Sequence, residues 1–386
     1  MKNNFLLKKG LENSIVFYFL LFLACLNFNG RGPVIFLFFC IWGCLKTYKS
    51  KILWNVSSIC YLGMALFASI ASILFFEEKE ILKSLVYFLA FYIGYKGYMV
   101  SGEKQIFVRR LFFSAFVGYF VNLAITYYIN FIVIGHIAGK RELYSFWTND
   151  LISVTLAGLM SSVPIAYSFY CFFCRYNIAY KILGIVCVVL VAVVNMGTAT
   201  RTPFILMGIV YCLLMFELLV SKSEQKKGRI IFLILSLVFI VFYKVLPNME
   251  NSALVERFSD EGMNTSRIDI TITYINNMLD CPFGGSEIYA KTKLLAHNFI
   301  FEAYDMYGII FFFFMVILLT QMIRRVWSLH KLPYKNDVTY LLLSIYIAVG
   351  IQVMLEPVIG GYPQLVWTLF LVDGVTIPYL RDSYKN

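Results

Sequence analysis

Two arginines and one histidine stand out in this sequence because each lies where a helix is expected to begin. His297 opens an apolar run in Ala296-His297-Asn298-Phe299, Arg201 precedes Thr202-Pro203, and Arg267 follows Ser266. A histidine whose pKa lies near neutrality can act as a base or as a hydrogen-bond donor. An arginine beside a helix N-terminus, where free N–H groups and the positive dipole end meet, suits a phosphate. These residue types indicate an anion-binding site with a base close to it.

The spacing around His297 predicts which residues share its surroundings. Gly308 follows it by eleven residues, which at about 100° each returns to within about 20° of the start, so both are expected on one helix face. Glycine there allows close helix packing. Glu302 and Asp305 are costly so near a bilayer unless they pair or face water. Their alternative role is an ion pair with Arg201 or Lys244 that holds helices together.

A third arginine also lies just before a helix that is expected to begin with proline. Arg31 lies in Gly30-Arg31-Gly32-Pro33, ahead of another helix that begins with proline. Thr202 is expected to cap its helix and Pro203 to take the first helical position. Each arginine also has a structural alternative: Arg31 as an interfacial anchor, Arg201 as a snorkelling side chain, and Arg267 as half of a surface ion pair or as a staple of the loop.

The composition places these residues in a membrane protein. Hydrophobic residues make up 60% of the 386, and charged residues only 14%, where a soluble domain carries about 25%. The mean hydropathy is +0.75. The net charge of +11 does not indicate nucleic acid, because the basic residues alternate with apolar runs as in cytoplasmic loops. We expect an all-α integral membrane protein.

Apolar runs long enough to cross a bilayer predict about twelve transmembrane helices. They cover residues 14–28, 33–45, 52–76, 81–98, 111–134, 151–174, 182–196, 203–220, 230–246, 297–322, 338–355 and 362–380. The first run is expected to be a permanent span, because Asn27-Phe28-Asn29-Gly30 is no signal-peptide cleavage site. With both termini in the cytoplasm, two thirds of the 33 Lys and Arg residues fall on the inner side, as the positive-inside rule requires.

One long connection interrupts this pattern. Spans one to nine form a bundle over residues 1–246, a large extracytoplasmic loop covers 247–296, and spans ten to twelve cover 297–386. The loop between spans nine and ten is expected to be partly helical, because Ile268, Ile272, Ile275 and Leu279 recur at helical steps. That helix should lie on the membrane surface or pack under the loop. A loop of this length in a compact protein is usually functional.

Taken together, these motifs resemble the bacterial superfamily of O-antigen polymerases and O-antigen ligases, which includes capsule polymerases. The resemblance rests on the His297-to-Gly308 spacing, on Arg267 followed by Pro282, Gly284 and Gly285, and on an outer arginine after a Thr-rich turn. It covers about residues 195–318 by motif. The analogous arginine-to-glycine spacing is missing at Arg201, because position 212 is cysteine.

The resemblance implies a metal-independent glycosyltransferase without a cofactor. It would move a glycan from undecaprenyl pyrophosphate onto the non-reducing end of another lipid-linked repeat unit. Catalytic roles then fall to His297, Arg267 and Arg201, pyrophosphate binding to Arg201, Arg267 and Arg31, and supporting roles to Glu302, Asp305 and Gly308. The expected partners are the lipid-linked oligosaccharide, membrane lipid, and a chain-length regulator and flippase, with no nucleic acid. The expected location is the bacterial inner (plasma) membrane, with the active face outside.

Three alternatives differ in class or acceptor. An O-antigen ligase would use the same donor and pass the glycan to lipid A–core. A lipid-linked oligosaccharide flippase would suit twelve spans, although transporters often show repeated halves and charges at the midplane. A non-catalytic scaffold of envelope assembly would not depend on His297 or on the arginines.

Overall fold

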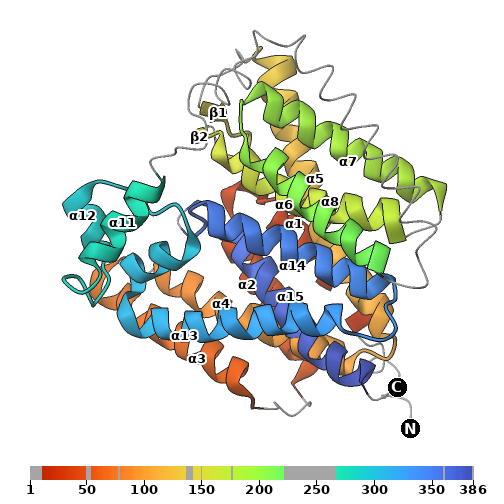
Figure 1. The fold of residues 1–386 in the computed structure, drawn as a ribbon, viewed down its shortest axis with the longest axis horizontal. Helices are drawn as coiled ribbons and strands as arrows, with labels where there is room; N and C mark the ends of the chain where they lie inside the picture. Colours follow the sequence, from red (N-terminus) through yellow and green to blue (C-terminus); the bar gives the residue numbers. More distant parts are fainter. Residues whose placement is uncertain are drawn as a thin grey trace.

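The computed structural model describes most of the chain as one helical bundle (Figure 1). The described residues are 11–48, 54–76, 79–135, 142–148, 150–174, 177–220, 267–359 and 361–384. The predicted span 230–246, Lys244 and the first part of the long loop lie outside these residues.

The described chain is almost entirely helical. The helices are α1 (Ile15–Cys25), α2 (Gly32–Thr47), α3 (Val56–Phe75), α4 (Lys79–Val100), α5 (Lys104–Tyr127), α6 (Thr155–Phe169), α7 (Ile178–Gly197), α8 (Thr202–Val220), α11 (Arg267–Asn277), α12 (Glu287–Thr292), α13 (Phe299–His330), α14 (Asp337–Leu355) and α15 (Gln364–Ser383). Short π-helical turns extend α5 (Tyr128–Val133) and α6 (Tyr170–Cys174), and one-turn 3₁₀ segments occur at Leu11–Asn13 and Phe28–Gly30. Strands β1 (Glu142–Tyr144) and β2 (Leu151–Ser153) pair antiparallel as a hairpin between α5 and α6.

Seven of these helices are long and apolar enough to cross a membrane: α3, α5 with its π-turn, α6 with its π-turn, α7, α8, α13 and α14. Shorter apolar helices cover Ile15–Cys25, Gly32–Thr47 and Leu85–Val100. At about 1.5 Å per residue, a 20-residue helix spans the roughly 30 Å of a hydrocarbon core. The expectation of an all-α membrane-embedded protein is confirmed, while the count of twelve spans stays a prediction.

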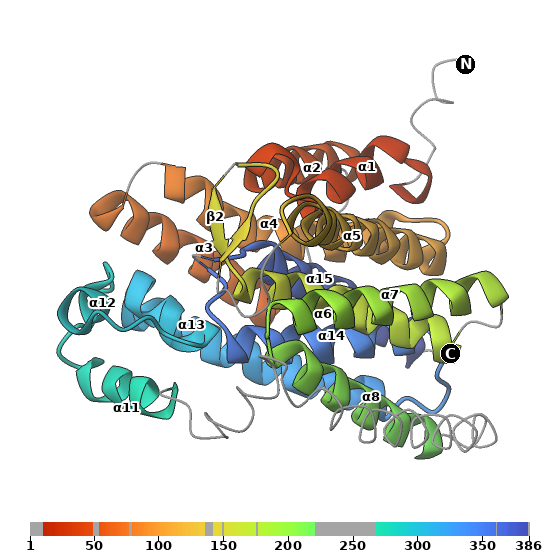
Figure 2. The same ribbon diagram turned by 90° about the horizontal axis from the view of Figure 1, so that it is seen from above.

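Helix α15 forms the centre of the bundle. Its residues from Gln364 to Leu380 are buried with few exceptions, and Figure 2 shows the other helices packed around it. It approaches α4 closely because glycines face each other: a Cβ at Gly94 would lie 2.4 Å from the Leu371 carbonyl oxygen, and one at Gly374 would lie 2.2 Å from that of Phe91. Small residues let helices approach in this way where lipid provides no hydrophobic driving force.

A buried charge network joins four helices on one side of α15. Asp373 of α15 is fully buried and forms an ion pair with Arg325 of α13. Its carboxylate also accepts hydrogen bonds from Tyr346 and, at 3.1 Å between oxygens, from Tyr61, and Arg325 donates to Ser57. A charge in a membrane bundle is expected to be paired and to face its interior. The network therefore ties α3, α13, α14 and α15 together.

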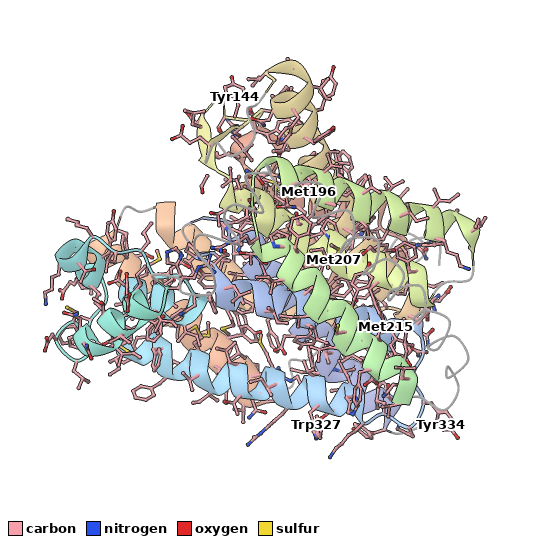
Figure 3. The ribbon with its side chains drawn as sticks, turned by 45° about the horizontal axis from the view of Figure 1, so that its top comes forward. Tyr144, Met196, Met207, Met215, Trp327 and Tyr334 are labelled. Atoms are coloured by element: carbon pink, nitrogen blue, oxygen red, sulfur yellow. The ribbon has the colours of Figure 1, made fainter. Side chains whose placement is uncertain are left out.

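The two ends of the bundle differ in charge and structure. One end, here called the loop end, carries Arg31, Arg201, Arg267, His297 and Glu356 with the hairpin, α11 and α12. The opposite end carries ion pairs between Lys104 and Asp382, Arg109 and Asp337, and Lys335 and Glu217. Figure 3 shows the separation, with Tyr144 of the hairpin on one side of the molecule and Trp327 and Tyr334 on the other.

The approach of α4 and α15 gives a first testable prediction. Gly374→Ala places a methyl group against the Phe91 carbonyl and should lower the free energy of unfolding by about 1–3 kcal/mol through overpacking. Gly208→Ala on α8 is the matched control, because nothing lies within 4 Å of its Cβ position. Thermal unfolding in detergent micelles measures both variants. Equal stability of the two would contradict the described packing.

Candidate functional site

The centre of the candidate site is a buried carboxylate that the sequence analysis did not single out. Glu356 directly follows α14, is 3% exposed, and has extended backbone before Pro357. Its Oε1 accepts a hydrogen bond from Arg267 Nη2 at 2.8 Å and one from the Thr202 hydroxyl at 2.9 Å. Arg267 Nη1 also donates to the Leu355 carbonyl at 2.9 Å. Glu356 thus connects the ends of α14, α11 and α8.

Arg267 takes the position that the sequence predicts for it, at the start of the loop helix. Its side chain remains 36% exposed beside the buried Glu356. Nη1 and Nη2 each donate one hydrogen bond to the end of α14. A guanidinium has five N–H donors, so others remain for another group. The expected surface ion pair is replaced by a half-buried one with Glu356, so Arg267 is held in place and is still accessible.

Arg201 lies next to this pair through its neighbour Thr202. The expectation that Thr202 caps α8 is wrong by one residue: α8 begins at Thr202, and the backbone N–H groups of Phe204 and Ile205 reach the Arg201 carbonyl. The Thr202 hydroxyl binds Glu356, a partner that a local sequence pattern cannot reveal. The N-terminus of α8, with its positive dipole end, therefore lies beside the Arg267–Glu356 pair.

His297 lies near the same pair in a half-buried position. Its Nδ1 is buried and has no hydrogen-bond partner among the described residues. Burial lowers the pKa of His297 below its usual value, the Arg267 charge lowers it further, and Glu356 opposes the shift. The neutral imidazole is thereby favoured at neutral pH, and it retains a nitrogen that can accept a proton.

The predicted helix face shared by His297 and Gly308 is wrong. His297 precedes α13, where Asn298 caps the helix by accepting from the Phe301 N–H at 2.9 Å. Gly308 interrupts the helix with φ 82° and ψ −177°. A Cβ there would lie 2.8 Å from the backbone of Phe283. The close approach expected of this glycine is made to the loop backbone and not to another helix.

The loop crosses α13 at this break. The Gly285 N–H donates to the Met306 carbonyl at 3.1 Å, and the Ile309 N–H donates to the Pro282 carbonyl at 2.9 Å. The loop backbone thus supplies hydrogen bonds where the helix is interrupted. These bonds fix the position of α11 and α12 against the first turns of α13.

Glu302 and Asp305 hold segments of the loop end. Glu302 Oε2 accepts from the backbone N–H groups of Val358 and Ile359 at 2.7 and 2.8 Å, which fixes the connection after Glu356. Asp305 is 6% exposed, and its Oδ1 accepts from the Ile288 N–H at 2.9 Å. Both carboxylates thus accept hydrogen bonds from backbone N–H groups of the loop end.

Arg31 lies apart from the other arginines. Its side chain is exposed at the turn between α1 and α2 and forms no hydrogen bond or ion pair with another described residue, while its backbone N–H donates to the Phe28 carbonyl. Its neighbour Gly32 packs against Gln364 at the start of α15, so Arg31 does lie at the loop end. No contact joins Arg31 to Arg267, Glu356 or His297.

The sequence analysis also missed Gln352. This residue precedes Glu356 by one helical turn, is fully buried, and has neither side-chain polar atom hydrogen-bonded within the described part of the chain. A buried amide without partners is costly, so its retention asks for a reason. The available signal was a glutamine in an otherwise apolar run that ends in Glu356-Pro357.

The arrangement contains cations and a base, and no gathered metal ligands. Across the described residues, no three His, Cys, Asp or Glu side chains come together as a metal site. No protein-family model matches this sequence, and a comparison with curated proteins finds no match.

The charge environment of His297 predicts a pH effect on stability. The pKa of a histidine in an unfolded chain is about 6.5, and in the folded protein it is lower. The unfolded state therefore binds more protons below that value, and stability falls as the pH drops from about 7 to 5. His297→Gln should show a smaller fall than the wild type in thermal unfolding at pH 8, 7, 6 and 5. Equal slopes for the two proteins would contradict this environment.

The role of Glu356 predicts a change in loop exposure. Glu356→Ala removes the partner of Arg267 and of Thr202, so the start of α11 should detach from α14. Limited trypsin digestion should then cut after Arg267 several-fold faster than in the wild type. Cleavage after the exposed Lys293 serves as the internal control and should be unchanged. An unchanged Arg267 cleavage rate would show that other contacts hold α11.

Proposed function

We propose that this protein is a polymerase of bacterial surface polysaccharide, either O-antigen or capsule, that uses an undecaprenyl-pyrophosphate-linked donor. The observation that carries the proposal is the gathering of Arg267, His297 and the N-terminus of α8 around Glu356. These groups come from parts of the chain that only the fold brings together. They combine anion binding with a proton acceptor.

In the proposed reaction, a hydroxyl on the non-reducing sugar of a lipid-linked repeat unit attacks the anomeric carbon of the donor glycan. The new C–O bond forms as the bond from that carbon to the pyrophosphate oxygen breaks, and undecaprenyl pyrophosphate leaves with the electron pair. The hydroxyl proton passes to the neutral His297, whose Nδ1 lacks a partner in the described structure.

The cations serve the leaving group in this reaction. Negative charge grows on the pyrophosphate as the bond breaks, and fixed positive groups stabilise that charge most where water is limited. Arg267 is accessible and already oriented by Glu356, and Arg201 lies at the start of α8. Arg31 lies away from them, so we assign the pyrophosphate to Arg267 and Arg201.

The same proposal orients the protein in the bacterial plasma membrane. Many of the described Lys and Arg residues lie at the end opposite the loop end, including Lys104, Arg109, Arg325 and Lys335. By the positive-inside rule that end faces the cytoplasm, and the loop end faces outward. Lipid-linked repeat units carried to the outer leaflet would then meet Arg267 and His297 there.

The test is complementation of a strain that lacks this gene. His297→Ala and Arg267→Ala should each reduce long-chain surface polysaccharide by about 100-fold or more, the usual scale for a general base or a charge-stabilising group. Lys293→Ala, in the same loop, is the matched control and should restore long chains. Gel profiles measure chain length, and immunoblots of membranes confirm insertion.

The outcomes separate the alternatives. If His297→Ala and Arg267→Ala both insert into the membrane and still restore long chains, the proposal is overturned. Normal chain length with loss of attachment to lipid A–core would favour a ligase. Loss of every surface glycan, including single repeats, would favour a flippase.

A further inference from the structure

A second site of different chemistry lies at the loop end. It is a shallow recess between the α1–α2 turn, the end of α5, the β1–β2 hairpin and the start of α6. Its lining includes Asn27, Asn122, Thr126, Phe146 and Trp147, and none of the described residues that line it is charged. This separates it from the cationic surroundings of Arg267.

Aromatic rings gather at the recess. The Trp147 ring lies 5.1 Å from that of Phe28 and 4.9 Å from that of Phe146, between ring centroids. Phe28 and Phe146 are 45% and 49% exposed. Ligand sites typically combine such rings with a few placed polar groups. The exposed rings offer apolar faces that C–H groups can contact.

Two of the hydrogen bonds made by polar side chains of the recess are long, whereas those of Thr126 and Asn27 have ordinary lengths. Trp147 Nε1 donates to Asn122 Oδ1 at 3.4 Å, and Asn122 Nδ2 donates to the Tyr362 hydroxyl at 3.4 Å. Both distances lie beyond the usual range for good hydrogen bonds. A ligand hydroxyl could replace either bond at little cost, because little is lost when it breaks.

One short connection links the recess to the site at Glu356. Tyr362, which meets Asn122, follows Glu356 by six residues, a span of at most about 20 Å. Glu302 fixes this connection midway through the N–H groups of Val358 and Ile359. The two sites therefore have a limited separation on the same end of the bundle.

We propose that this recess binds an uncharged sugar ring of the acceptor glycan and holds the chain so that its end reaches His297. The proposal rests on the proposed function. An uncharged pyranose matches the recess in both respects, since it presents C–H faces to aromatic rings and hydroxyls to amides. An anionic group would find no cation among the described residues of the lining. The ring lies on the exposed faces of Phe28 and Phe146 at the mouth of the recess, and the remaining sugars lie outside.

The experiment measures binding of the repeat-unit oligosaccharide released by mild acid from the surface polysaccharide of the native strain. Titration calorimetry with the full-length protein in nanodiscs should give binding that Trp147→Ala weakens about tenfold or more. Trp147→Phe keeps a ring and should weaken binding less. Trp54→Ala is the matched control, because Trp54 is exposed at the opposite end.

Each outcome decides the proposal. Equal affinity of Trp147→Ala and the wild type would overturn it, even if that variant were less stable, and would leave Trp147 as an interfacial anchor. A wild type that does not bind the oligosaccharide at millimolar concentration would also overturn it. The complementation test reports separately on the function. A further combination is that Arg267→Ala and His297→Ala restore long chains while Trp147→Ala weakens oligosaccharide binding. That combination would contradict the polymerase function and still support a sugar site at the recess.

Discussion

The loop end of this protein depends on the carboxylate of Glu356. A buried carboxylate is stable only when its oxygens receive hydrogen bonds or a counter-charge, and here Thr202 and Arg267 supply both. The two partners lie 154 and 89 residues away along the chain. One charge thereby joins the start of α8, the start of α11 and the end of α14, and it opposes in part the lowering of the His297 pKa. The groups that we assign to donor binding are positioned through this contact.

Much of the architecture follows from local properties of the sequence. Apolar runs of sufficient length predict most of the described helices, and the spacing of the isoleucines predicts α11. Both signals depend only on neighbouring residues in the sequence. The contacts of the candidate site required the fold. Nothing local distinguishes Thr202 as a ligand of Glu356 from Thr202 as a helix cap. The spacing from His297 to Gly308 suggested one continuous helix, yet a glycine with positive φ ends that regularity. A single sequence does not reveal which glycine is used in that way.

Polar groups inside the bundle fall into two kinds. Near the opposite end, Asp373 has its charge and hydrogen bonds met by Arg325, Tyr61 and Tyr346. Near the loop end, Gln352 and the His297 Nδ1 are buried without partners among the described residues. A satisfied network stabilises a fold, whereas an unsatisfied buried group costs free energy. Buried atoms without partners also occur at the opposite end, at Arg109 Nε and Arg381 Nε, so a missing partner does not by itself assign a ligand to Gln352 or His297.

The crossing of the loop over Gly308 has a consequence for local unfolding. Because Ile309 and Met306 are hydrogen-bonded to Pro282 and Gly285, the loop cannot detach without opening the backbone of α13 on both sides of the break. The segment around α11 and α12 and the first turns of α13 should therefore open as one cooperative unit, with their amide hydrogens exchanging together. Connecting loops are in general more mobile than the elements they join. Here the protection of this loop against exchange is expected to match that of the helix it crosses.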